Sequence, residues 1–511
     1  MVYLVQQYFS QSAQQYPTKI AVSCEDSSIT YRDLDLFSNA FAHRIKQIGV
    51  KPGELVPFFM KKSINSAKSF LSILKADGGY VPIDFNSPGQ RLEAILLASN
   101  ARILIVDNLG EARFKELLPN SNVQLLNVDT FEGGDTSPHE YQNLSIDIAY
   151  VLFTSGSTGT PKGVMISHQA ITDYIEDCVG FFNITAEDQI ANHVPLYFDM
   201  STFDIYCAFK VGATLHLVHE ELNAVLPLLV RWLSDRKITI LFCVPSALAM
   251  MHKSRRLKPD SFPEFRHLIT AGEVLPPAVT AEWMKLYPHI QVTNMYGPTE
   301  ITVTCCHYVI QTIPGADCIH IPIGKPRPNM DFLIRTEDGS ITKALGAEGE
   351  LLVRGMSVAY GYLGDEERTQ KVFIQNPQHK LYHDPVYCTG DLVRIEPDGN
   401  FVCIGRMDTQ IKYMGYRIEL GEIESVIGST EGIQEVVVVF NNSPDESQKV
   451  IAALISLQPG VTQEQAQAAI KKRLPAYMLP GIIKVTADEF PRTPNGKYDR
   501  KAALSLLCGS I

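Results

Sequence analysis

Two hydrophobic patterns alternate along the first four hundred residues. Apolar side chains recur at helical spacing from Ala67 to Leu74, stop at Gly78 and Gly79, and give way to the short apolar run 80 to 83. Apolar residues three or four positions apart share one helix face, so this pattern predicts a helix that leads into an extended segment. Its repetition along the chain is typical of layered α/β domains.

Three further apolar runs read as buried strands, each ending where Gly or Pro turns the chain. They cover residues 239 to 244, 267 to 270 and 290 to 296. Open α/β sheets bind ligands beyond the carboxyl ends of their strands. We therefore expect ligand-binding side chains just after these three runs.

The pattern changes near residue 408. A polar stretch there precedes about a hundred residues with helices and strands of their own. The predicted elements are a helix over 420 to 427, strands over 436 to 440 and 451 to 457, and a helix over 463 to 472. The predicted fold class is α/β, with a large N-terminal layered α/β domain (1–407) and a small α+β C-terminal domain (408–511).

Composition narrows the class of protein. The 511 residues carry a net charge of -11, and 45% of them are hydrophobic. This charge provides no basic field for nucleic acid or anionic lipid, so any polyanion must be bound locally. No signal peptide or membrane-spanning run is evident at the sequence level, and we expect a cytoplasmic protein.

The ten cysteines are scattered without a CxxC pair, which favours buried reduced thiols over a disulfide framework. Cys305, Cys306 and His307 are adjacent. Neighbouring side chains of a strand point to opposite faces, so these three residues are not expected to form a metal site.

The segment 154 to 162, ThrSerGlySerThrGlyThrProLys, carries the most chemistry. Small residues leave backbone amides and hydroxyls free to surround a polyanion, and Lys162 adds a cation. A Walker loop needs Ser or Thr directly after its lysine, whereas Gly163 follows here. The segment thus suggests a different triphosphate-binding chemistry, the alternative being a polar surface loop. GlyGlyAspThrSer (133–137) is interpreted as a loop.

Seven more segments accompany this loop in a fixed order, and together the eight resemble the core motifs of adenylate-forming enzymes, specifically nonribosomal-peptide-type amino-acid adenylation domains. The seven are LeuLysAlaAspGlyGlyTyrValProIleAsp (74–84), PheAspMetSer (198–201), AsnMetTyrGlyProThrGlu (294–300), TyrCysThrGlyAspLeu (387–392), GlyArgMetAspThrGlnIleLys (405–412), GlyTyrArgIleGluLeuGlyGluIleGlu (415–424) and AsnGlyLysTyrAspArg (495–500).

The resemblance implies ATP and Mg²⁺ as cofactors and a set of nucleotide-binding residues. Glu300 would hold the magnesium ion, Thr299 the α-phosphate, and Lys497 would bridge the substrate carboxylate and the α-phosphate. Cations and metal placed where negative charge builds up suit attack of a carboxylate on a polyphosphate. The remaining nucleotide-binding residues implied are Thr154, Ser155, Gly156, Ser157, Thr158, Gly159, Lys162, Tyr296 (adenine), Asp391 (ribose) and Arg406.

The resemblance also implies two half-reactions. An acyl-adenylate forms, and a phosphopantetheine thiol then displaces AMP. In the family the mobile C-terminal domain rotates about the residue that matches Asp408, which exchanges Lys497 for the loop at Gly415. Because the sequence ends at Ile511, the carrier protein is expected to be a separate chain.

Asp199 matches the family position that binds the α-ammonium group, which favours an amino acid as substrate. The implied pocket walls carry no charge, so a charged side chain would be left unpaired there. The walls resemble those of stand-alone proline-activating enzymes of pyrrole and anatoxin-type alkaloid pathways. They are Met200, Phe203, Phe242, Ile269, Ala271, Met295, Val303 and Thr304.

A D-alanine ligase and a non-catalytic homologue are the alternatives to a proline-activating enzyme, and Asp199 argues against an acyl-CoA ligase. GlyGluValLeuPro (272–276) resembles D-alanine ligases that charge carrier proteins. An acyl-CoA ligase would more naturally lack Asp199. A nucleotide-binding homologue without catalysis would be marked by loss of Lys162, Glu300, Asp391 or Lys497, and all four are present.

Overall fold

The computed structural model describes residues 2–156, 161–443, 448–492 and 498–509. The chain divides into two compact units. The first contains residues 1–85, 96–153 and 163–407. The second contains residues 86–95, 154–162 and 408–511.

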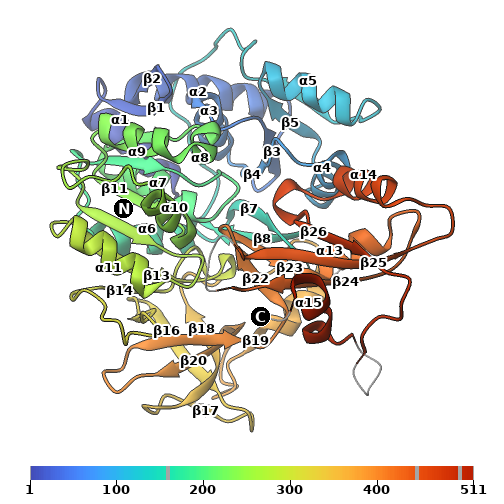
Figure 1. Ribbon diagram of the computed structural model, residues 1–511. Coiled ribbons are helices and arrows are strands. Elements are labelled where there is room, and N and C mark those ends of the chain that lie inside the picture. The colour runs from blue at the N-terminus through green and yellow to red at the C-terminus, as the bar shows by residue number, and fades with distance from the viewer. Residues whose placement is uncertain (1, 157–160, 444–447, 493–497, 510–511) are drawn as a thin grey trace. The chain divides into compact units, whose positions relative to one another are not determined.

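A nine-stranded sheet forms the larger layer of the first unit (Figure 1). Its central strands β1, β10, β9, β11, β12 and β13 run parallel, and β2, β14 and β15 are antiparallel at the edges. In spatial order the strands are β15 (Lys325–Pro326), β14 (Cys306–Val309), β13 (Gln291–Tyr296), β12 (His267–Thr270), β11 (Ile240–Cys243), β9 (Gln189–Asn192), β10 (Thr214–Leu217), β1 (Ile20–Cys24) and β2 (Ser27–Thr30).

A six-stranded sheet forms the second layer, with parallel pairing of β6, β5, β3, β4 and β7. Its central strands β3, β4 and β5 are almost wholly buried, as expected for a parallel sheet covered on both faces. The order is β6 (Gln124–Asn127), β5 (Ile103–Val106), β3 (Leu55–Phe59), β4 (Gly79–Ile83), β7 (Ile148–Thr154) and β8 (Lys162–Ser167).

Helices connect the parallel strands, and local signals fix where they begin. Thr30 caps α2 by accepting the Asp33 amide, and at the start of α3 the Ser63 amide donates to Ser66 Oγ at 3.1 Å. The helices are α1 (Gln6–Gln15), α2 (Tyr31–Gln47), α3 (Ile64–Lys75), α4 (Gly89–Ala98), α5 (Asn108–Leu117), α6 (His168–Phe181), α7 (Met200–Val211), α8 (Glu220–Ala224), α9 (Leu226–Asp235), α10 (Pro245–Lys253), α11 (Pro277–Leu286) and α12 (Glu366–Val372).

The prediction that helices and strands alternate up to residue 400 is wrong from about residue 330 onwards. From residue 330 to residue 406 the chain forms an antiparallel sheet with only the short α12 between strands. Short connections permit antiparallel pairing, whereas parallel pairing needs a crossover. The strands are β17 (Ile341–Thr342), β16 (Met330–Arg335), β18 (Glu348–Gly355), β20 (Pro385–Ile395), β19 (Phe373–Gln375) and β21 (Phe401–Arg406).

The second unit has a core of its own around Ile423, Val438 and Ile455. All four elements expected after residue 408 are present within three residues of their predicted bounds. The unit contains β22 (Gln410–Tyr413), β23 (Tyr416–Glu419), α13 (Leu420–Gly428), β24 (Ile433–Asn441), β25 (Val450–Leu457), α14 (Gln463–Arg473), the 3-10 turn η3 (Ala476–Met478), β26 (Ile482–Val485) and α15 (Arg500–Cys508).

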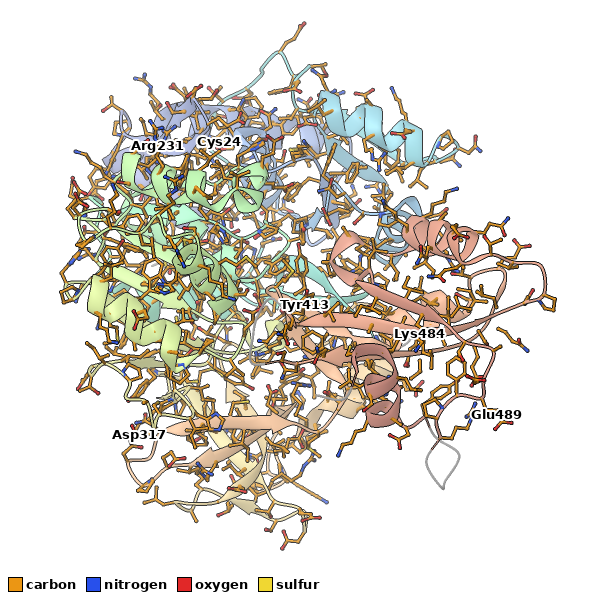
Figure 2. All side chains as sticks on the ribbon, in the orientation of Figure 1. Cys24, Arg231, Asp317, Tyr413, Lys484 and Glu489 are labelled. Carbon is orange, nitrogen blue, oxygen red and sulfur yellow. The ribbon has the colours of Figure 1, made fainter. Side chains whose placement is uncertain are left out.

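The predicted fold class is confirmed: a large N-terminal α/β part and a small C-terminal α+β part. All ten cysteines are free thiols, and seven are buried; one of these, Cys24 at the end of β1, is labelled in Figure 2. Among the described residues, no helix is both long enough and apolar enough to cross a bilayer.

Histidine burial makes the folded state sensitive to acid. His168 begins α6 with no exposed surface, and its Nδ1 accepts the Val5 amide hydrogen bond at 3.3 Å. Burial lowers the pKa of His168 to about 3, and burial likewise lowers the pKa values of His193 and His216 to about 4. The unfolded chain therefore binds more protons than the folded chain below the usual pKa of about 6.5.

We expect the contribution of neutral His168 to be complete above pH 6.5 and to fall as the pH drops towards 3. The loss amounts to about 1.4 kcal/mol per pH unit in that window, or roughly 2 kcal/mol at pH 5. Urea unfolding at pH 7.5 and pH 5 would measure it. His168→Gln should reduce the difference between the two pH values, and His320→Gln, at an exposed histidine, should not. An undiminished difference in His168→Gln would contradict the assignment.

Candidate functional site

The register of the nine-stranded sheet gathers the expected pocket walls. Phe242 of β11 pairs with Ile269 of β12, and Ile269 pairs with Thr293 of β13. Side chains alternate along a strand, so Ala271 and Met295 continue the same face two residues further on. Phe242, Ile269, Ala271 and Met295 are at most 2% exposed. They lie at or just after the carboxyl ends of parallel strands, as the sequence predicted.

Helix α7 contributes the opposite side of this cluster. Phe203 packs edge-on against Phe242 with ring centroids 5.3 Å apart. Met200, the first residue of α7, lies near Gly272, since a Cβ at Gly272 would be 3.9 Å from the Met200 sulfur. Two buried aromatic rings and two methionines narrow the space that these walls enclose.

Asp199 directly precedes α7 and faces the segment after β13. The Thr299 hydroxyl donates a hydrogen bond to Asp199 Oδ2 at 2.7 Å. Thr299 begins the 3-10 turn η1 (Thr299–Ile301), which follows Pro298. The residue expected to bind an ammonium group is thus in contact with a residue expected to bind phosphate.

Glu300 is fully buried within the same turn. The Tyr362 hydroxyl donates to Glu300 Oε1 at 2.7 Å, and the Ala359 amide donates to the Glu300 carbonyl at 2.9 Å. A carboxylate is a suitable ligand for Mg²⁺, so Glu300 fits the expected role. Over the described ranges no cluster of three His, Cys, Asp or Glu side chains could hold a metal, so an ion at Glu300 would take further ligands from phosphate and water.

Asp391 joins two sheets through its carboxylate. The Tyr296 hydroxyl donates to one carboxylate oxygen and Arg406 Nη1 donates to the other, each at 2.5 Å. Asp391 of β20 pairs directly with Arg406 of β21, which explains the second contact. Burial and the Asp391 charge raise the pKa of Tyr296 well above its usual value, so the phenol stays protonated as a donor.

The wall formed by Val303 and Thr304 has strained backbone. Thr302 and Val303 have φ values of +50° and +71°, a region that a β-branched residue rarely adopts. Gly297 makes room for this turn, because a Cβ there would be 2.5 Å from the Thr304 Cα. Strain of this kind persists only where surrounding contacts enforce it.

The loop of small residues is described only in part. Ser157, Thr158 and Gly159 lie outside the described residues. Ser155 Oγ donates to the Arg417 carbonyl at 2.6 Å, and the Gly156 amide donates to Glu422 at 2.9 Å. Thr154 ends β7 and Lys162 begins β8.

Asp408 and Gly415 belong to the second unit. Asp408 accepts the Gln410 amide at 3.1 Å. Gly415 and Met414, with φ values of +82° and +52°, form the two-residue turn between β22 and β23, next to the Tyr413 labelled in Figure 2. Two successive positive φ values are typical of a type I′ hairpin turn. Lys497 lies outside the described residues.

One buried cation at the end of β9, Lys62, was not anticipated from the sequence. Lys62 is 5% exposed, and its ammonium donates to the carbonyls of Asn192, His193 and Val194 at 3.0 to 3.2 Å. Burial lowers the pKa of Lys62 to about 8. Lys62 fixes the backbone where β9 ends and the chain continues towards Asp199. The Lys61–Lys62 pair gives no sequence signal of this role, since lysines are usually exposed.

The family model described as "AMP-binding enzyme" matches residues 9–363, and "AMP-binding enzyme C-terminal domain" matches residues 422–497. The chain therefore belongs to the AMP-binding enzyme family. These two matches confirm the resemblance to nonribosomal-peptide-type adenylation enzymes seen in the sequence.

Surfactin synthase subunit 2 of Bacillus subtilis is 33% identical over 500 residues, which is 97% of this chain and 14% of the synthase. The chain spans less than half the length of the curated relatives it matches. The Vibrio cholerae adenylation domain AlmE, solved with glycyl-adenosine-5'-phosphate, has a TM-score of 0.88 at 22% identity, covering 99% and 98% of the two chains. An artificially fused adenylation–PCP di-domain, NpsA-ThdA from Klebsiella oxytoca, has a TM-score of 0.83 at 24% identity, covering 94% and 93%.

Proposed function

We propose that the protein activates an amino acid with ATP to form an aminoacyl-adenylate. The Thr299–Asp199 contact carries this proposal, because it joins a carboxylate suited to an ammonium group to a hydroxyl suited to a phosphate. A carboxylate oxygen of the amino acid attacks the α-phosphorus of ATP, the bond to the bridging oxygen breaks, and pyrophosphate leaves. Mg²⁺ at Glu300 would neutralise phosphate charge during this step.

Other residues of the chain would bind and orient the nucleotide. Asp391, already held by Tyr296 and Arg406, presents a carboxylate for the ribose hydroxyls. Lys162 and the loop from Thr154 to Gly159 are assigned to the phosphates, and Lys497 to the α-phosphate and the substrate carboxylate. Support for the loop and for Lys497 comes from the sequence motifs.

The amino acid is proposed to be L-proline. The walls from Met200 to Thr304 are uncharged and buried, which disfavours Arg, Lys, Asp and Glu as substrates. Bulky Met and Phe side chains leave space for a compact apolar group. D-alanine is the second candidate, because the motif at 272 to 276 resembles that of D-alanine ligases.

A carrier protein with a phosphopantetheine arm is the proposed acceptor. Its thiolate attacks the carbonyl of the aminoacyl-adenylate, the mixed anhydride bond breaks, and AMP leaves. The AlmE structure with glycyl-adenosine-5'-phosphate and the fused adenylation–PCP di-domain support this type of reaction sequence. Alkaloid or pyrrole biosynthesis is the corresponding proposed context.

ATP–pyrophosphate exchange with a panel of amino acids tests the proposed activity. We expect the highest kcat/KM for L-proline. Azetidine carboxylate should also react, because one methylene in an apolar pocket is worth only about 1 to 3 kcal/mol. A higher kcat/KM for D-alanine or for a charged amino acid would overturn the pocket assignment. If none of the amino acids in the panel supported ATP–pyrophosphate exchange, the proposed activity would be overturned.

Asp199→Ala should impair proline activation and leave ATP binding nearly intact. The charge-assisted hydrogen bond to the ammonium is worth roughly 1.5 to 3 kcal/mol, or about a 10- to 150-fold rise in KM for proline. Calorimetric titration with ATP provides the control. Equal loss of ATP affinity would show that Asp199 acts on the nucleotide.

Lys497→Ala and Gly415→Val should separate the two half-reactions. Lys497→Ala should slow adenylate formation by roughly 10²- to 10³-fold, the usual effect of losing one electrostatic donor, while transfer from supplied prolyl-AMP to the carrier survives. Gly415→Val should retain exchange and lose transfer. Loading followed by mass spectrometry measures both variants.

Gly415 has a positive φ, so the valine also strains the hairpin. Gly415→Asn, which tolerates this conformation better, separates strain from obstruction. Parallel loss of both activities in Lys497→Ala and Gly415→Val would contradict the assignment of one step to each residue.

A further inference from the structure

A buried cation lies directly behind the strained wall of the candidate pocket. The Arg327 side chain has no exposed surface and is paired with Asp173 of α6, Nη1 to Oδ2, at 2.7 Å. Its Nε donates to the Thr304 carbonyl at 3.2 Å, and its own amide donates to the Cys305 carbonyl at 3.0 Å. Arg327 therefore contacts the backbone of one wall residue and of the residue after it.

The anchoring of Arg327 is extensive. Arg327 Nη2 also contacts the Ser357 hydroxyl, and the guanidinium lies 5.5 Å from the ring centre of Tyr174. Ser357 Oγ reaches Asp173 at 3.1 Å, and Asn329 donates to the other Asp173 oxygen at 2.7 Å. A buried ion pair with this many hydrogen bonds has a fixed geometry.

Ser357 and Tyr174, which contact Arg327, also contact residues of the strained turn through side-chain hydroxyls. The Thr302 hydroxyl donates to the Ser357 carbonyl at 2.8 Å, and the Thr304 hydroxyl is 3.4 Å from the Tyr174 hydroxyl. The Cys305 amide donates to the Tyr296 carbonyl at 2.8 Å. Positive φ at Thr302 and Val303 is thus enforced by contacts on both sides of the turn.

We propose that Arg327 is a specificity-determining positioning residue, which together with Asp173 and Ser357 fixes where Val303 and Thr304 stand in the amino-acid pocket. This inference rests on the proposed function, since Val303 and Thr304 matter for specificity only if an amino acid binds there. The Arg327 side chain has no exposed surface, so in this role it acts through the wall backbone. A lysine would keep the charge but lose the planar fork that serves Asp173, Ser357 and the Thr304 carbonyl together.

Arg327→Lys and Ser357→Ala are the two gentle variants for the test. Arg327→Met combined with Asp173→Leu removes both charges, so that folding is not limited by an orphaned buried ion. The matched control is Arg266→Met. Arg266 pairs with Asp188 at 3.0 Å and precedes β12 at the end opposite to Ala271. This control reports the effect of losing an Arg–Asp pair away from the pocket.

ATP–pyrophosphate exchange is measured for each variant with proline and with pipecolate, which is one methylene larger. The ATP concentration is varied in a separate series. In the Arg327 variants we expect the KM for proline to rise roughly 10- to 100-fold, as displaced positioning groups commonly cause. The KM for ATP should stay within about twofold, and the preference for proline over pipecolate should fall by roughly tenfold. Ser357→Ala should show the same changes to a smaller degree.

Amide hydrogen exchange gives a readout independent of catalysis. Peptides covering 302 to 306 should exchange faster in Arg327→Lys and at the wild-type rate in Arg266→Met. If the KM for proline, the preference for proline over pipecolate and the amide hydrogen exchange of 302 to 306 were all unchanged in the Arg327 variants, this inference would be overturned. The proposed function would be unaffected. Equal rises in the KM values of proline and ATP would also overturn it. Wild-type protein that activates no amino acid would instead overturn the proposed function.

Discussion

The parallel register of β11, β12 and β13 is the constraint on which the candidate site depends. Residues paired across parallel strands share a face, so fixing Phe242 opposite Ile269 also places Ala271 and Met295. Strands β11 and β12 end at paired residues, β13 continues for two more residues, and the segments that follow supply the polar groups. A slip of one residue would turn every one of these side chains to the other face.

The sequence reveals the strands of this sheet because their signals are local. Short apolar runs bounded by Gly or Pro predicted β11, β12 and β13 closely, and the sequence motifs led to Asp199, Glu300 and Asp391. The antiparallel sheet from β16 to β21 was missed because strand direction depends on partners distant along the chain. A buried apolar run reads the same in either kind of sheet.

Lys62 and Arg327 show a second limit of sequence reasoning. Each is charged and reads as a surface residue, yet each is buried by partners far away in sequence. Lys62 binds carbonyls about 130 residues later, and Arg327 pairs with Asp173, 154 residues earlier. Burial of a charge is decided by tertiary partners that no local pattern contains. Positive φ at Val303 is likewise invisible in the sequence, because nothing about valine favours it.

The acidic residues of the site are already compensated in the structure, which bears on how substrates would enter. Asp391 accepts from Tyr296 and Arg406, and Asp199 accepts from Thr299. Asp391 is buried, and a buried carboxylate without donors would be costly, so its two donors stabilise it there. The Thr299 hydroxyl has one proton to donate. Under the proposed function it can serve Asp199 or a phosphate oxygen, but not both. A carboxylate has about four acceptor sites, so Asp199 can accept from the ammonium group whether Thr299 donates to it or to the phosphate.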